Sequence, residues 1–218
     1  MAKAISSTEP AGIKPHRPRP PRKIKLGPRF LRAFAFAAEK HAGQVRKAST
    51  IPYIAHLMGV ASLVLEFGGD ENMAIAALLH DVVEDCGGEP MLTEVRRKFG
   101  IRVANIVEGC TDSYTVPKPP WHDRKERYLR HLKHADGATR LVSAADKLNN
   151  VRSILADYRL IGDQIWERFN GGREATLWYY RALLEEFQRM NPSRLIAEFA
   201  LAVRELEAIA QAGGRDDG

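Results

Sequence analysis

The stretch MAIAALLHDVVED, residues 73–85, decides the fold of this chain. Its first part, MAIAALL, would be apolar on every side of a helix, which is typical of a helix at the centre of a protein. The stretch then passes directly into one histidine and three carboxylates. Burying an ionised carboxylate without a partner is costly, and the C-terminal end of a helix disfavours negative charge. The pattern therefore predicts a central helix over residues 71–85 whose carboxylates meet a bound cation.

Two interpretations of this helix end are open. In a helix, residues four apart stack one turn above another, which pairs His80 with Glu84 and Asp81 with Asp85. The carboxylates could simply reach solvent, with His80 hydrogen-bonded in the core, and for an isolated His-Asp pair that outcome is the more frequent one. The alternative is that these side chains hold a metal ion.

Two further residues favour the metal site. His56 lies in the first turns of another apolar helix, and Asp146 interrupts the apolar face of a third. Two imidazoles and two carboxylates from three helices can form a partial octahedron that leaves positions open to water and substrate. This mixed nitrogen and oxygen set suits manganese, iron or, less well, zinc. The predicted ligands are His56, His80, Asp81 and Asp146.

The remainder of the chain is also helical in pattern. Of its 218 residues, 44% are hydrophobic and 28% are charged, which is typical of a globular protein with a buried core. Apolar residues recur at helical spacing, and glycine or proline ends most of these runs. We find no alternating strand of useful length, no repeat and no glycine-rich phosphate loop. The sequence predicts one all-α domain over residues 28–212, with helices over residues 30–41, 53–67, 71–85, 91–99, 101–110, 121–134, 138–159, 176–188 and 193–210.

The net charge of +6 comes from the N-terminal segment. Residues 1–25 contain seven basic side chains and one acidic side chain, so the rest of the chain is balanced. Because the segment is rich in proline and poor in large apolar residues, we predict a disordered basic tail over residues 1–27. We also predict a flexible C-terminus over residues 213–218. A body without net charge argues against a nucleic-acid partner.

Composition also indicates a compartment. No apolar run approaches the roughly 20 residues that a membrane span needs, and the N-terminus lacks the apolar stretch of a secretory signal. The two cysteines, Cys86 and Cys110, show no paired spacing that would indicate a disulfide scaffold or a zinc site. We therefore expect a cytoplasmic protein without membrane attachment. The sequence does not indicate an oligomeric state.

In their order His, His-Asp, Asp, the four predicted ligands resemble those of the HD phosphohydrolase superfamily. The flanking sequence resembles the hydrolase domain of the RelA/SpoT family more specifically. The chain has no room for the synthetase and regulatory domains of the long enzymes, so the resemblance is to free-standing small alarmone hydrolases, including the metazoan type with a D-K-L-x-N motif. The segments that carry it are HAGQVRK (41–47), PYIAH (52–56), LLHDVVED (78–85), FGIRVA (99–104) and ADKLNNVR (145–152).

The resemblance implies an HD-domain helical bundle with a metal site, usually for Mn²⁺, between central helices; Fe²⁺ or Zn²⁺ are alternatives. It implies that Glu84 and Asp85 handle the attacking water, that Arg46 and Lys47 line the nucleotide site, and that Asn150 lies near the ribose. The implied reaction removes pyrophosphate from the 3′ position of guanosine 3′-diphosphate 5′-di- or triphosphate.

The chain departs from the family pattern at three positions; none removes a ligand, but the changes near Arg46 leave base preference open. Leu57 stands where the family usually has proline, Ala48 stands where serine is frequent, and Lys147 replaces the arginine of the long enzymes. A second hypothesis is an HD phosphohydrolase that acts on another nucleotide, such as an adenine analogue of the alarmone or the 2′-phosphate of NADPH. A catalytically silent module that senses nucleotides is a third hypothesis, against which the intact pair of Glu84 and Asp85 argues.

Weaker indications of substrate-binding residues lie after the helix that is predicted to end near residue 110. Lys118, Arg124 and Lys125 lie in a basic, aromatic segment and could gather the 5′-phosphates or could form a solvated surface. Tyr179 or Tyr180 could stack on the base, although an aromatic pair in an apolar helix is more often part of the core.

Overall fold

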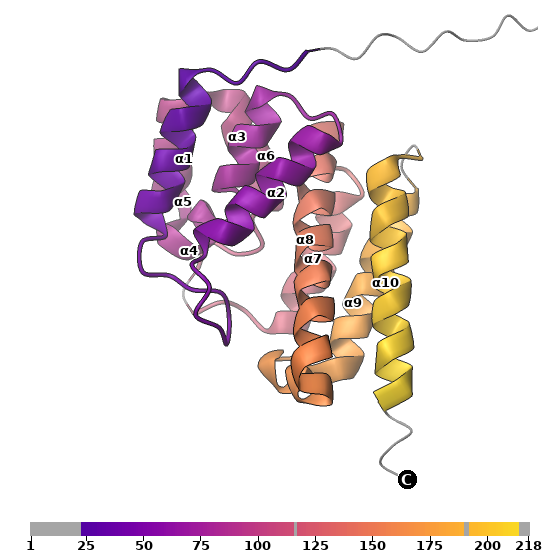
Figure 1. Cartoon of the computed structure of the whole chain (residues 1–218). Helices are drawn as coiled ribbons and strands as arrows, with labels where there is room; N and C mark the ends of the chain where they lie inside the picture. Colours follow the sequence, from indigo (N-terminus) through magenta and orange to yellow (C-terminus); the bar gives the residue numbers. More distant parts are fainter. Residues whose placement is uncertain (1–22, 116, 190–191, 214–218) are drawn as a thin grey trace, which may run out of the picture.

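The computed structural model describes residues 23–115, 117–189 and 192–213, and these are helical throughout apart from their connecting loops (Figure 1). This confirms the predicted all-α class. Within the described residues, no helix is long and apolar enough to cross a membrane. The helices are α1 (Pro28–Lys40), α2 (Ile54–Glu66), α3 (Glu71–Leu79), α4 (Val82–Cys86), α5 (Gly88–Phe99), α6 (Ile101–Cys110), α7 (Trp121–Leu132), α8 (Gly137–Ile161), the 3₁₀ helix η1 (Gly162–Arg168), α9 (Gly172–Gln188) and α10 (Arg194–Gly213).

Helix α3 is the centre of the core, as its apolar sequence predicts. Ala74–Leu79 are each at most 1% exposed, and α3 packs against α1, α2, α6 and α8. Its N-terminus begins at Asp70, whose Oδ1 accepts a hydrogen bond from the backbone N–H of Met73 at 3.1 Å. A helix enclosed in this way can present its last residues only to other helices, which places His80 inside the bundle.

Helix α8 connects the two parts of the molecule. It stands between the group formed by α1–α6 and the pair formed by α9 and α10 (Figure 1). Asp136 begins it by accepting a hydrogen bond from the backbone N–H of Thr139 at 2.7 Å. At Gly109 of α6, an added Cβ would lie 2.5 Å from Thr139 Cγ2, so glycine allows α6 to approach α8 closely. This packing brings Asp146 to the C-terminal end of α3.

The predicted continuous helix over residues 71–85 is wrong, because a turn at His80 and Asp81 separates α3 from α4. Asp81 has φ −97° and ψ −7°, away from ideal helical values. Its Oδ2 accepts a hydrogen bond from Tyr53 Oη at 2.6 Å, which holds the side chain in this turn. Glu84 and Asp85 therefore belong to a separate short helix, α4, and not to α3.

Two other features were not predicted. Residues 162–168 form the 3₁₀ helix η1, and the loop between α1 and α2 contains an isolated bridge between Val45 and Pro52. The predicted tail over residues 1–27 lies outside the described residues except for residues 23–27, where the backbone N–H of Gly27 donates to Glu71 Oε1 at 2.6 Å. Most of the predicted flexible C-terminus, residues 214–218, also lies outside them.

Candidate metal centre and adjoining pocket

Three of the four predicted ligands meet at one point. His56 from α2, His80 from the end of α3 and Asp146 from α8 are all buried, and their ligand atoms lie within 4.8 Å of one another. His56 Nε2 is 3.4 Å from His80 Nε2 and 3.2 Å from Asp146 Oδ1. His80 Nε2 is 3.5 Å from the same oxygen. Atoms with lone pairs therefore converge from three separate helices.

Asp81 adjoins this cluster through Oδ2. That oxygen lies 3.0 Å from His80 Nε2 and 3.6 Å from His56 Nε2. It also accepts the hydrogen bond from Tyr53, whose ring packs edge-on against His56. The turn between α3 and α4 is what allows Asp81 to reach back to both imidazoles, so the structure brings the four predicted residues together.

The electrostatics of the cluster favour positive charge at its centre. Burial by itself lowers the pKa of each imidazole, but the carboxylates of Asp81 and Asp146 outweigh burial and raise the pKa of both histidines. Burial by itself raises the pKa of the two carboxyls, yet the facing imidazoles hold the pKa of both well below the usual range, with Lys147 as the larger influence on Asp146. Two nitrogen and two carboxylate donors in such a field fit a divalent transition-metal ion.

Two of the proposed ligands, His80 and Asp146, make further contacts that the sequence did not predict. His80 Nδ1 lies 2.8 Å from the carbonyl oxygen of Ala77. Asn150 Nδ2 donates to Asp146 Oδ1 at 2.6 Å, and Lys147 Nζ donates to Asp146 Oδ2 at 2.5 Å. Contacts of this kind fix the orientation of metal-binding side chains. Asn150, which was predicted near the ribose, thus also contacts the cluster.

Glu84 and Asp85, which are predicted to act on the attacking water, lie in α4 and accept hydrogen bonds from several donors. Lys118 Nζ donates to Glu84 Oε1 at 2.7 Å and to Asp85 Oδ1 at 3.3 Å. Gln44 Nε2 donates to Asp85 Oδ2 at 3.0 Å. The backbone N–H of Asp112 donates to Glu84 Oε2 at 3.2 Å. Glu84, which is half-buried, and Asp85, which is exposed, are therefore held in defined positions beside a cation.

Asp112, whose carboxylate is buried between α6 and α7, was not predicted from the sequence. Arg124 Nη1 donates to its Oδ2 at 2.5 Å, and Lys125 Nζ donates to the same oxygen at 2.7 Å. Arg124 Nε also donates to the carbonyl oxygen of Pro119 at 3.1 Å. Arg124 is only 8% exposed and does not line the adjoining cavity. Asp112 could have been identified from the sequence, because it is an aspartate that lies directly after an apolar helix and before a basic segment.

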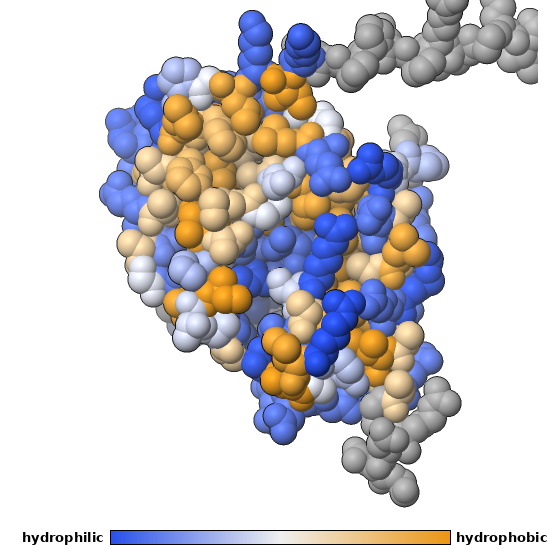
Figure 2. Space-filling model, in the orientation of Figure 1, coloured by the Kyte–Doolittle hydropathy of each residue, from blue (hydrophilic) through white to orange (hydrophobic). Residues whose placement is uncertain are grey.

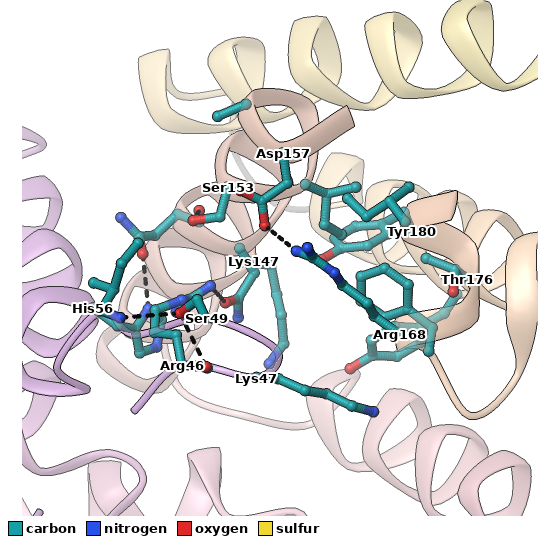
Figure 3. Close-up of a pocket in the computed structure, with 18 of the residues that line it drawn as sticks. Arg46, Lys47, Ser49, His56, Lys147, Ser153, Asp157, Arg168, Thr176 and Tyr180 are labelled. Carbon is teal, nitrogen blue, oxygen red and sulfur yellow. Dashed lines mark hydrogen bonds and ion pairs between the residues drawn. The ribbon is translucent and has the colours of Figure 1, made fainter. Parts of the chain in front are cut away.

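A cavity of about 520 Å³ adjoins the cluster (Figure 3). Its wall includes His56 itself, so the candidate metal centre and the cavity are continuous. Figure 3 shows Lys47, Lys147 and Arg168 around the same space, and in Figure 2 a recess with hydrophilic colours lies beside the lower part of α8. Six of the predicted site residues outside the metal cluster also line the cavity, namely Arg46, Lys47, Lys125, Asn150, Tyr179 and Tyr180.

Arg46 and Lys47 reach this cavity from a tight loop between α1 and α2. The backbone N–H of Arg46 donates to Ile51 O at 2.9 Å, and that of Ser49 donates to Arg46 O at 3.1 Å. Ala48, between them, has φ +53°, a strained value for a residue with a side chain. Arg46 Nη2 then donates to Asn150 Oδ1 at 3.1 Å. The loop thus connects the cavity wall to the residues around Asp146.

Tyr179 lines the cavity with its ring faces already in contact. Lys125 Nζ lies 5.0 Å from the ring centroid, and Trp121 packs edge-on at 5.8 Å. Its buried hydroxyl has no hydrogen-bond partner within the described residues. The contacts with Lys125 and Trp121 hold the Tyr179 ring in the cavity wall. The far end of the cavity also contains an ion pair that the sequence did not predict, between Arg168 Nη1 and Asp157 Oδ2 at 2.9 Å.

Comparisons with known proteins agree with this geometry. Residues 33–174 match the HD domain family model. Over 128 residues the chain is 43% identical to the guanosine-3′,5′-bis(diphosphate) 3′-pyrophosphohydrolase MESH1 of Xenopus tropicalis and 40% identical to that of Homo sapiens; each alignment covers 57% of this chain and 69% of the relative. A solved structure of a metazoan SpoT orthologue, described as hydrolysing ppGpp, shares the fold with a TM-score of 0.69 at 23% identity, over 84% of this chain and 98% of that one. The resemblance inferred from the sequence is thereby confirmed, and the chain belongs to the HD-domain family and, within it, to the group that includes the MESH1 proteins.

Proposed function

We propose that this protein is a metal-dependent hydrolase that removes the 3′-pyrophosphate from guanosine 3′,5′-bis(diphosphate)-type nucleotides. The observation that carries the proposal is the continuity between the cluster and the cavity, since His56 belongs to both. A nucleotide in the cationic cavity would have its phosphates next to the candidate metal centre. The names and 40–43% identity of the MESH1 relatives support the same reaction and substrate class.

The position of each residue in the site indicates the role that we propose for it. A divalent cation held by His56, His80, Asp81 and Asp146 would supply Lewis-acid chemistry to the phosphoryl group. Arg46 and Lys47 line the cavity as cations that bind phosphate oxygens, and Asn150 positions Arg46 through their hydrogen bond.

Glu84 is proposed to orient and deprotonate the attacking water, with Asp85 beside it. The attack forms a bond from the water oxygen to phosphorus and breaks the bond from phosphorus to the 3′ oxygen. Pyrophosphate leaves, and the 3′ oxygen becomes a hydroxyl group. Lys118 lies beside both carboxylates, so its ammonium can neutralise them or an incoming phosphate. Phosphoryl transfer depends mainly on such positioning and charge neutralisation.

We propose Mn²⁺ as the native ion, because the donor set combines imidazole nitrogen with carboxylate oxygen. The test is elemental analysis of the purified protein, followed by removal of the ion with a chelator and return of Mn²⁺, Fe²⁺ or Zn²⁺ one at a time. Mn²⁺ should restore the highest turnover. Full activity with Zn²⁺ alone would assign zinc instead.

We further propose that the protein works in the reducing cytoplasm, where Cys86 and Cys110 would stay as the free thiols seen here.

The decisive experiment incubates the Mn²⁺-loaded protein with a panel of nucleotides and separates the products by chromatography. The guanosine bis(diphosphate) should yield pyrophosphate and guanosine 5′-diphosphate. Exclusive hydrolysis of the adenosine analogue, or release of phosphate from NADPH, would replace the guanosine alarmone by the second substrate class. Binding without any product would indicate the nucleotide-sensing module.

A further inference from the structure

The two ring nitrogens of His56 face different partners. Nε2 points into the metal cluster, whereas Nδ1 lies 2.7 Å from Asn149 Oδ1. An amide oxygen only accepts hydrogen bonds, so in this pairing Nδ1 carries the proton of the neutral ring. The lone pair is then on Nε2, the atom that faces His80 and Asp146. Asn149 therefore selects the tautomer of His56 that is able to bind a metal ion.

Gly59 has no side chain, and the Asn149 amide occupies the space that a side chain at position 59 would fill. A Cβ added to Gly59 of α2 would lie 2.5 Å from Asn149 Nδ2 and 3.3 Å from Asn149 Cγ. Both residues are half-buried where α2 faces α8, so a larger residue at position 59 would push the amide away from α2. Gly59 is thus the counterpart of Asn149 on the facing helix, one turn after His56.

The other imidazole of the cluster, that of His80, is not oriented by a side chain. His80 Nδ1 pairs at 2.8 Å with the carbonyl oxygen of Ala77, three residues earlier in the same chain segment. His80 is therefore oriented by local backbone, but His56 depends on a side chain from α8. Asn149 lies three residues after Asp146, so one helix supplies a candidate ligand and orients a second one.

We propose that Asn149 is a positioning residue for the metal centre, and that Gly59 is required because it makes room for the Asn149 amide. The inference rests on the metal site proposed above and not on the identity of the nucleotide. It assigns a role to the position that the D-K-L-x-N motif leaves open, immediately before Asn150.

The first test replaces Asn149 and measures binding of Mn²⁺ alone, by electron paramagnetic resonance of the free ion. Asn149→Leu keeps the approximate size but cannot accept a hydrogen bond, and we expect a Kd roughly 10- to 100-fold higher than in wild type. Asn149→Asp still offers an acceptor to Nδ1, so its Kd should stay within a few-fold of wild type. Arg152→Ala, on the exposed side of the same helix, is the matched control and should bind as wild type does.

A spectroscopic measurement separates this role from a merely structural one. Ring-nitrogen NMR of the metal-free protein at alkaline pH should show His56 protonated at Nδ1 in wild type and Asn149→Asp, and a mixture of tautomers in Asn149→Leu. Wild-type Mn²⁺ affinity in a folded Asn149→Leu, or an unchanged tautomer, would overturn the inference. A wild type that binds no divalent ion would instead refute the proposed metal site.

The second test examines the coupling between the two positions. Gly59→Ala should weaken Mn²⁺ binding when Asn149 is present, because the new Cβ displaces the amide. In the background of Asn149→Ala the same substitution meets a smaller side chain and should change the Kd by less than two- to three-fold. Equal effects of Gly59→Ala in both backgrounds would show that Gly59 does not act through Asn149.

Discussion

Lys118 Nζ lies 2.7 Å from Glu84 Oε1, although the two residues belong to segments on either side of α5 and α6. The loop before α7 therefore supplies the charge that faces the acidic pair of α4. Partial burial lowers the pKa of Lys118, but Glu84 and Asp85 outweigh burial and raise that pKa. Lys118, which the sequence suggested as a binder of 5′-phosphates, is thus placed where the attacking water is proposed to be held.

Replacing Lys118 should impair catalysis. In Lys118→Met, Glu84 and Asp85 lose the cation that faces both, so we expect kcat/KM for the guanosine bis(diphosphate) to fall by about tenfold or more. Lys118→Arg keeps the charge and should retain more activity than Lys118→Met. Lys133→Met, which removes a partly exposed lysine after α7, is the control. Steady-state kinetics that match wild type for Lys118→Met would rule out this role.

Glu84→Gln should separate chemistry from binding. The substitution keeps the size of the side chain but removes the carboxylate that could accept a proton from water, a role worth about 10²–10⁴-fold in rate. We expect kcat to fall by on the order of 10²-fold, with Mn²⁺ content and nucleotide affinity close to wild type. Glu89→Gln, an exposed site at the start of α5, is the matched control. Normal turnover by a metal-loaded Glu84→Gln would show that the assignment is wrong.

Arg46 and Asn150 should act as one unit in substrate binding. Because Arg46 Nη2 donates to Asn150 Oδ1 at 3.1 Å, loss of either residue disturbs the other. Arg46→Ala should raise KM by about tenfold or more, since a charge-assisted contact to phosphate is removed. The double variant Arg46→Ala/Asn150→Ala should be less impaired than the product of the single effects predicts. Strictly multiplicative effects on kcat/KM would indicate that the two residues act independently.

Asp112 should contribute to stability in a pH-dependent way. Burial raises the pKa of its carboxyl, but Lys125 and Arg124 outweigh burial and lower that pKa. Asp112→Asn leaves the buried Arg124 and the half-buried Lys125 without their counter-charge, and breaking a buried pair costs about 3–5 kcal/mol of unfolding free energy. Because the folded pKa is lowered, this contribution is complete above about pH 4 and is lost as the pH falls further.

Urea unfolding measures that dependence. The difference in unfolding free energy between wild type and Asp112→Asn should be largest at neutral pH and should shrink in acid. Asp123→Asn, on the exposed face of α7, serves as the control and should differ little from wild type at either pH. A difference for Asp112→Asn that is the same at neutral and acidic pH would contradict the assigned ion pairs.

Deletion of residues 1–22 should leave hydrolysis within a few-fold of wild type. Every residue proposed for the chemistry lies beyond that segment, and Gly27, whose backbone N–H donates to Glu71, is retained. The measurement is kcat/KM of the truncated protein, with its folding checked by circular dichroism. A folded truncation without activity would assign residues 1–22 to the site or to an essential interface.

Much of this architecture could be predicted from local sequence. Helical periodicity and the placement of glycine and proline were sufficient for the all-α class and for most helix positions, because both act within a few residues of the chain. The choice of His56, His80, Asp81 and Asp146 rested on residue chemistry, since histidines and aspartates in apolar helices require partners. The structure shows these four side chains meeting, and their role as ligands stays a proposal.

The remaining features depend on contacts between distant segments. At the turn formed by His80 and Asp81, the Asp81 carboxylate accepts a hydrogen bond from Tyr53, 28 residues away. Asn149 contacts His56 across 93 residues of sequence, at a place where α8 comes close to Gly59 of α2. Periodicity records which face of a helix is buried, but not which side chain it meets there. The sequence by itself therefore determined the helices and the kinds of side chain available for a metal, and tertiary packing decided how those side chains are oriented and charged.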